Sequence, residues 1–194
     1  MIARKHVRAI ALVLAFLLIA SLLIACEPRS ADPGTDSAAR SEELTPGEFP
    51  DKEPPAPVEP PPPMLRNPET AVFSYLLWIT FAYRVLNSDV ATHAFDEWEE
   101  VRVNSYVELN RQESRAIDQR LLKFEPRAVE TKGDTATVSA REEWVYRYIS
   151  TGDGTYSTPR HEATYDTTYT VVNVQDKGWL VHKVEATPIG DTPK

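Results

Sequence analysis

The apolar residues of this chain change their spacing once, near residue 119, and that change restricts the fold more than any other feature. Before it, over residues 68–86, they recur at helical spacing. One face of that stretch carries Val72, Tyr75, Ile79, Ala82 and Leu86. The stretch opens with Asn67-Pro68, a capping residue followed by the residue favoured at the first helical position. We therefore predict a core helix here, apolar over more than half of its girth.

The pattern between this helix and residue 119 is weaker. Asn87 to Asp89 ends the first helix, and a short second helix is expected over about 90–99. A third helix, mostly polar, is expected over about 104–118. Its inner contacts would be Tyr106, Val107 and Ile117.

After residue 119 apolar and polar residues alternate, which indicates strands. The clearest case runs over 135–149, where every second side chain points the same way. That face carries Ala136, Val138, Ala140, Glu142, Trp144, Tyr146 and Tyr148. Glycine-containing turn signals follow at 132–134, 151–154 and 176–178. Helices followed by hairpin-linked strands predict an α+β fold, in which the N-terminal helices pack on one face of a curved, mainly antiparallel four-stranded sheet.

The strand region resembles a known family. It reads GDTATVSAREEWVYRY and then YDTTYTVVNVQDKGWLVHKVEA, which gives an A-x-V strand, an acidic and aromatic stretch, a tyrosine strand and a final G-W-x-V. These features are similar to the NTF2-like cone fold, and within it to the inner-membrane-space domain family of plastid division proteins, also seen on exported bacterial proteins. The resemblance covers most of 67–187. It implies a fold but no mechanism, because one fold hosts many functions.

The first 25 residues have the composition of an export signal. Three basic residues within 1–8 precede an uncharged apolar run over 9–25. The run ends in Leu23-Ile24-Ala25-Cys26, which looks like a bacterial lipobox; that resemblance implies cleavage before Cys26 and lipidation of its thiol. An uncleaved membrane anchor is the alternative, because the run lies at the short end of what spans a bilayer. Both interpretations attach the chain to the cell membrane with everything after residue 26 on the extracytoplasmic side.

Residues 26–66 are predicted to be a disordered, acidic linker. Twelve of the 16 prolines lie between Pro28 and Pro68, and such a composition cannot bury enough apolar surface to offset its ordering entropy. A docking site for a proline-binding partner is the alternative. Loss of the three positive charges of residues 1–25 takes the net charge from −8 to −11, which argues against nucleic acid as a partner. The domain is expected over 67–187, with a flexible tail over 188–194.

Motifs of catalysis are absent from the sequence. It has no glycine-rich phosphate loop, no HExxH, no GxSxG and no histidine pair at metal spacing, so we predict no catalytic residue, metal or cofactor. Two weaker candidates remain. Glu142 is either the acid of an isomerase-like pocket or a carboxylate that meets water where the strand leaves the core, and we favour water. His93 with Asp96 and Glu97 is either an acid–base group or a solvated helix surface.

Two functions follow from these observations. The first is a membrane-anchored lipoprotein whose domain binds or scaffolds a protein or another envelope component, as a monomer or a homodimer. The second is a small-molecule-binding or isomerase-like domain with an aromatic cavity. Its candidate lining is Glu142, Trp144, Tyr146, Tyr165 and Tyr169. A closed, filled cone favours the first function, and a deep cavity with Glu142 buried inside it favours the second.

Overall fold

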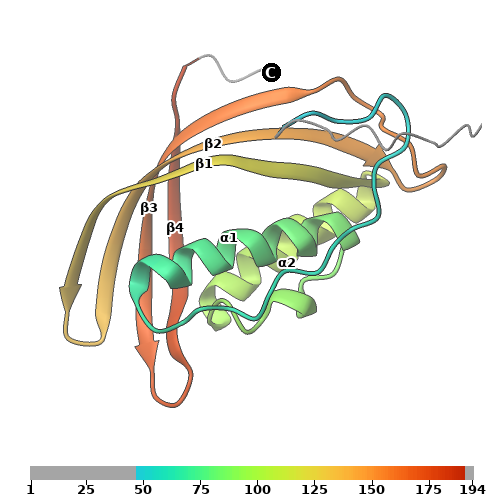
Figure 1. Ribbon diagram of the computed structural model, residues 1–194. Helices are drawn as coiled ribbons and strands as arrows, with labels where there is room; N and C mark the ends of the chain where they lie inside the picture. The colour runs from blue at the N-terminus through green and yellow to red at the C-terminus, as the bar shows by residue number, and fades with distance from the viewer. Residues whose placement is uncertain (1–46, 191–194) are drawn as a thin grey trace, which may run out of the picture. The chain divides into compact units, whose positions relative to one another are not determined.

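The computed structural model describes residues 47–190. Its helices are α1 (Pro68–Val85), the short 3-10 helix η1 (Asp89–Ala91) and α2 (Glu97–Gln112). Its strands are β1 (Arg115–Lys132), β2 (Thr135–Ser150), β3 (His161–Val174) and β4 (Gly178–Pro188). They form one sheet in the order β1-β2-β3-β4, each antiparallel to its neighbour. Both long helices lie against the concave side of this curved sheet (Figure 1), so the predicted α+β cone is confirmed.

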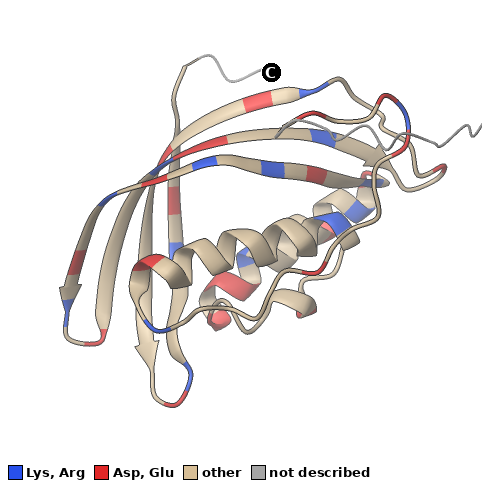
Figure 2. Cartoon of the chain, viewed as in Figure 1, with Lys and Arg blue, Asp and Glu red and all other residues tan. Residues whose placement is uncertain are grey.

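Helix α1 forms where its spacing predicts it. The Asn67 side chain accepts a hydrogen bond from the backbone N–H of Thr70 at 2.9 Å, and Leu86 ends the helix in a left-handed conformation with φ 53°. Four of the five residues of the predicted face are buried, and Leu86 is partly buried. Apart from Glu69 and Arg84 near its ends, α1 is uncharged along its length (Figure 2). It is therefore the central core helix.

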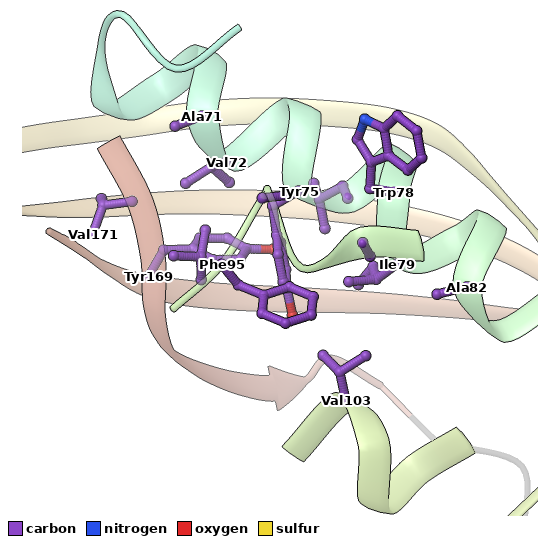
Figure 3. Packing of buried hydrophobic residues seen from close by; sticks show 14 of the residues in the cluster. Ala71, Val72, Tyr75, Trp78, Ile79, Ala82, Phe95, Val103, Tyr169 and Val171 are labelled. Atoms are coloured by element: carbon purple, nitrogen blue, oxygen red, sulfur yellow. The ribbon is translucent and has the colours of Figure 1, made fainter. Parts of the chain in front are cut away.

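The core lies between α1 and the sheet. The ring of Tyr75 meets the rings of Phe95 and Tyr169 edge-on, at centroid distances of 6.3 and 6.2 Å, and Figure 3 shows these side chains pointing toward one another. The sheet contributes the predicted face of β2, of which Ala136, Val138, Ala140, Glu142 and Trp144 are buried. The predicted apolar face of α1 and the predicted face of β2 thus bury each other.

The region between α1 and the sheet differs from the prediction. The expected helix over 90–99 is a single turn, η1, and the expected helix over 104–118 begins earlier and ends earlier, as α2. The Asp96 side chain caps α2 by accepting from the backbone N–H of Trp98 and Glu99. Ser114, with φ 53°, turns the chain into β1. Ile117 is buried as expected, but it projects from β1 rather than from a helix.

The disordered linker predicted over 26–66 is corrected for its second half, residues 47–66, which we call the strap. The strap runs along the domain as an extended segment without helix or strand (Figure 1). Its backbone carbonyls accept hydrogen bonds from domain side chains: Pro50 from Arg147 at 3.1 Å, Pro55 from Arg84 at 2.9 Å and Pro61 from Trp78 at 3.2 Å. The domain therefore begins before residue 67. The predicted signal peptide, Cys26 and the first half of the linker lie outside the described residues.

Candidate functional site

A cavity of about 250 Å³ lies between the two long helices and the concave face of the sheet. Helix α1 contributes Tyr75, Ile79 and Tyr83, and α2 contributes Arg102 and Tyr106. The remaining walls come from all four strands. Seven of the chain's eight tyrosines border the cavity, namely Tyr75, Tyr83, Tyr106, Tyr146, Tyr148, Tyr165 and Tyr169. The sequence thus concentrates one amphipathic side chain, with an aromatic face and a hydroxyl, around a single space.

Glu142 is the acidic residue of the cavity wall. Its side chain comes from the middle of β2, opposite Tyr165 on β3, and the residue is only 4% exposed. The indole N–H of Trp144 donates to Oε2 at 2.8 Å, and the hydroxyl of Tyr169 donates to Oε1. The prediction that this carboxylate meets water is therefore wrong. It fails because the buried face of β2 continues past the middle of the strand, through residue 144.

A second buried carboxylate, Glu99, lies on α2 and has a cationic partner. Arg102, one helical turn further on, donates through Nε to both carboxylate oxygens at 2.8 and 3.0 Å. The Tyr75 hydroxyl also donates to Glu99, and Arg102 donates to Tyr75. Burial raises the pKa of Tyr75 well above its usual value and raises the pKa of Tyr83 to about 12, although the positive charge of Arg102 opposes both shifts. Two of the three guanidinium nitrogens of Arg102, Nε and Nη2, thus donate to Glu99 and Tyr75.

Glu142 differs from Glu99 because its hydrogen-bond partners are both neutral. Within the described part of the chain no lysine, arginine or histidine forms an ion pair with it. Two donors satisfy two of the roughly four acceptor positions of a carboxylate. The rest of its acceptor capacity remains for a group inside the cavity.

Thr167 on β3 adds an unmatched polar group. The residue borders the cavity and is 3% exposed, and its hydroxyl has no hydrogen-bond partner among the residues described. A buried hydroxyl without a partner costs about 1–3 kcal/mol. A ligand in the cavity that hydrogen-bonds to this oxygen would remove that cost.

Tyr146, Tyr148 and Tyr165 form a less buried aromatic wall. The rings of Tyr146 and Tyr148 meet edge-on at 5.8 Å, and the ring of His161 stacks on Tyr146 at 5.1 Å. Partial burial raises the pKa of Tyr146 and of Tyr165. The hydroxyls of Tyr146 and Tyr165 therefore stay protonated at neutral pH, and these two residues offer uncharged aromatic faces.

The structure brings together all five residues proposed as a pocket lining, Glu142, Trp144, Tyr146, Tyr165 and Tyr169. Their role in binding stays a prediction. It does not assemble the proposed group of His93, Asp96 and Glu97: Asp96 caps α2 and contacts Nδ1 of His182 at 2.5 Å, while the ring of His93 lies against Trp78.

Sequence reasoning missed the α1 and α2 residues of the cavity, and it missed Thr167. The alternation of β3 contains the signal for Thr167, because it lies between Tyr165 and Tyr169 on the same face. Nothing in the sequence indicates that Tyr75 and Arg102 meet, since 27 residues separate them.

Residues 47–190 contain no cluster of histidine, cysteine and acidic side chains suited to a metal ion. No helix in this range has both the length and the apolar character needed to cross a bilayer.

Several solved structures resemble the domain. The intermembrane space region of the chloroplast protein ARC6 is 17% identical, over 62% of this chain and 94% of that chain, with a TM-score of 0.51. An NTF2-like superfamily protein from Salmonella enterica serovar Typhimurium is 12% identical over 63% of this chain and 91% of its own, with a TM-score of 0.43. A ketosteroid isomerase-like protein from Erwinia carotovora atroseptica is 15% identical over 64% and 95%, with a TM-score of 0.42.

No family model matches the chain. No curated protein matches it in sequence either. The similarity to the ARC6 region shows a shared fold, and this is the fold that the sequence motifs predicted. A cone of this kind with an internal cavity fits a binding or scaffold module, and the choice between these functions depends on the residues of this chain.

Proposed function

We propose that the domain is a binding module for a small molecule, which it holds in the tyrosine-lined cavity. The observation that supports this proposal best is the cavity itself, with the carboxylate of Glu142 buried in its wall. Concave, largely aromatic spaces with a few convergent polar groups are the usual form of a ligand site. Glu142 and the unmatched hydroxyl of Thr167 are such polar groups.

Binding is favoured over catalysis by the way Glu142 is held. Both of its oxygens accept hydrogen bonds, from Trp144 and Tyr169. Because both oxygens are already hydrogen-bonded, the side chain is fixed in one orientation, which suits it to position a ligand. A group held in this way orients and neutralises a ligand more readily than it takes a proton from one.

The location of the protein in the cell is part of the same proposal. The basic n-region, the apolar run and the lipobox-like end of residues 1–26 support attachment to the cell membrane through a lipid on Cys26, with the domain on the extracytoplasmic side. Such a protein would bind its ligand in the cell envelope.

Extraction of the bound compound tests the cavity. The full chain is purified from its own membranes in a maltoside detergent, denatured, and its small-molecule extract is analysed by mass spectrometry. Ala163 borders the cavity, so Ala163→Phe fills part of the space and is expected to abolish recovery of the compound. Ala128 is exposed on β1, so Ala128→Phe is the matched control and should retain it. Recovery of no compound from wild type, or equal recovery from Ala163→Phe, would contradict the proposal.

A second candidate is a scaffold formed by two copies of the chain. On α2, Trp98 and Val101 are 70% and 68% exposed, and grouped apolar side chains of this kind mark interaction sites. The helix is acidic in its first turn and basic, through Arg111, in its last. Antiparallel pairing with a second copy would therefore bring opposite charges together. A dimer by light scattering that becomes a monomer in Trp98→Lys is the expected result, and a monomeric wild type would exclude this candidate.

A further inference from the structure

We infer that the ligand of the cavity is a small organic cation, an ammonium group whose positive charge lies beside Glu142 and against the surrounding tyrosine rings. This inference rests on the proposed binding function and specifies its ligand class. It follows from three properties of the cavity: a buried carboxyl group with no cationic partner, a wall of aromatic side chains, and an arginine at the wall that is already paired with Glu99.

The charge of Glu142 gives the first argument. A carboxylate removed from water is costly unless a cation or several hydrogen bonds compensate it. Glu99, the other buried glutamate near the cavity, is compensated by Arg102. Glu142, at 4% exposure, has only the neutral Trp144 and Tyr169 as partners in the described chain. The counter-charge that Glu99 receives from its own helix is thus missing at Glu142, and a ligand cation would supply it.

The aromatic wall gives the second argument. The faces of aromatic rings carry partial negative charge, and they attract cations by about 2 kcal/mol or more when the site is desolvated. Tyr146, Tyr148 and Tyr165 line the cavity together with Trp144, and burial raises the pKa of Tyr146 and of Tyr165. Arg115 already lies over one face of Tyr148, 3.9 Å from the ring centroid, and His161 stacks on Tyr146, so a ligand cation would meet the ring faces that these two side chains leave open.

The remaining cation of the cavity wall, Arg102, gives the third argument. An arginine in a pocket often indicates an anionic ligand, because its fork of N–H groups fits carboxylates and phosphates. Here Nε and Nη2 donate to Glu99 and Nη2 also donates to Tyr75, so the charge of Arg102 is balanced within the chain by Glu99. An anion beside Arg102 would meet a charge that Glu99 already balances and would lie in the same cavity as the carboxylate of Glu142. The geometry therefore disfavours an anion.

The test compares a cation with an uncharged molecule of the same shape. Choline and 3,3-dimethylbutan-1-ol differ in one atom, nitrogen or carbon, and hence in charge. Each is titrated by calorimetry into the full chain in maltoside detergent, after removal of any co-purified compound. We expect choline to bind at least about tenfold more tightly than the alcohol, which corresponds to about 1.4 kcal/mol.

Matched variants locate the charge. Glu142→Gln removes it while keeping a hydrogen-bond acceptor for Trp144, and should lower choline affinity by about tenfold without weakening the alcohol. Glu143→Gln makes the same chemical change at the next residue, whose side chain is about half exposed and near Lys123, and should leave both affinities unchanged. Tyr165→Leu should weaken choline more than the alcohol, because it removes an aromatic face and keeps an apolar one. Near-ultraviolet circular dichroism checks that each variant is folded.

The outcomes separate this inference from the proposed function. Equal binding of choline and the alcohol, tighter binding of the alcohol, or choline binding that is unchanged in Glu142→Gln would overturn the cation and leave the cavity as a ligand site. Absence of choline binding at millimolar concentration would also overturn it. The proposed function is judged separately, by whether a compound is recovered from wild type and lost in Ala163→Phe.

Discussion

Ile79 shows at the scale of one residue how the helix and the sheet depend on each other. It lies on the inner face of α1, is 7% exposed, and belongs to the buried cluster that includes Val138 and Trp144 on β2. It also borders the cavity. Its side chain therefore supports both the fold and the shape of the site.

We predict that Ile79→Ala lowers the free energy of unfolding by about 2–5 kcal/mol, as other large-to-small core changes do. The loss should be near the upper part of this range, because the new space joins an existing cavity and cannot be filled by local collapse. Urea unfolding of the full chain, followed by tryptophan fluorescence, measures it. Val129→Ala, at an exposed position of β1, is the control and should cost little. Similar losses in both variants would show that Ile79 is not part of the core.

Glu142 shows where single-residue prediction stops. Alternation along 135–149 places Glu142 on the same face as Trp144 and Tyr146, and the structure agrees with that placement. Alternation does not say how far the helices extend over that face. That extent depends on the curvature of the sheet and on the positions of α1 and α2, which no local pattern contains. The sequence predicts which side chains of β2 face the helices, but it does not predict that the carboxylate of Glu142 is buried.

The strap is the element that composition describes least well. The prediction of disorder rests on the conformational entropy that a chain loses when it becomes ordered. Proline loses less of this entropy than other residues, because its backbone is already restricted in the unfolded state. A proline-rich segment therefore needs few contacts to stay in place. It also keeps its carbonyl oxygens, and Arg84, Trp78 and Arg147 donate to three of them.

We predict that brief treatment of the full chain with a broad-specificity protease leaves a resistant fragment that begins near Gly47 rather than near residue 67. Gly178→Ala should move cleavage into the strap, because its new Cβ would lie 2.4 Å from the carbonyl oxygen of Leu65, at a φ of +96°. That carbonyl accepts from the backbone N–H of Trp179 at 2.9 Å. N-terminal sequencing of the fragments is the measurement.

Gly133→Ala is the matched control for this experiment. Gly133 also has a positive φ, +62°, but nothing lies within 4 Å of the Cβ position. The variant carries a similar backbone strain in the turn between β1 and β2 and should leave the strap protected. A wild-type fragment that begins at 64–70 would show that the strap is open in solution.

The start of β1, just after α2, is a strand that the sequence pattern does not indicate, because it is buried on both faces. Ala116, Ile117 and Asp118 are buried in succession at the start of β1. Tyr156 donates to Asp118, so polar and apolar residues are covered alike. In a strand that is buried on both faces, apolar and polar residues no longer alternate. The start of β1 therefore lacks the pattern typical of a strand, and in the sequence it looks like a continuation of the polar helix before it. The predicted helix over 104–118 included these residues for that reason.

At the scale of the whole molecule, the strap shortens the segment that would link the domain to a lipid on Cys26, if that residue is lipidated. If a lipid is attached at Cys26, at most the 21 residues to Gly47 separate anchor and domain. Even fully extended, such a segment spans roughly 75 Å at most. The dense proline run at 53–63 is part of the domain and adds nothing to this distance.

We predict that cells given a clickable fatty acid incorporate it into the wild-type chain and not into Cys26→Ser. Cys26→Ser chains that still lose residues 1–25 should leave the membrane fraction. Chains that keep residues 1–25 should stay in the membrane fraction, and their higher apparent mass identifies them. Ser21→Cys in the Cys26→Ser background moves the thiol away from the lipobox-like position and should not restore labelling. Labelling of Cys26→Ser at the wild-type level would contradict lipidation at this residue.

The buried tyrosines make the stability of the whole domain depend on alkaline pH. Burial raises the pKa of Tyr83 from 10.0 to about 12, and it raises the pKa values of Tyr75 and Tyr169 as well. In the unfolded chain these hydroxyls ionise near pH 10, so between about pH 10 and 12 the folded state holds more protons than the unfolded state. The free energy of unfolding must then fall as pH rises through this window. The stabilisation is fully present below pH 10, and Tyr83 alone accounts for about 2–3 kcal/mol of the loss. Urea midpoints at pH 9, 10 and 11 measure this fall in the free energy of unfolding, and the fall should be smaller in Tyr83→Phe. Equal midpoints at all three pH values would show that these tyrosines ionise as freely in the folded domain as in the unfolded chain.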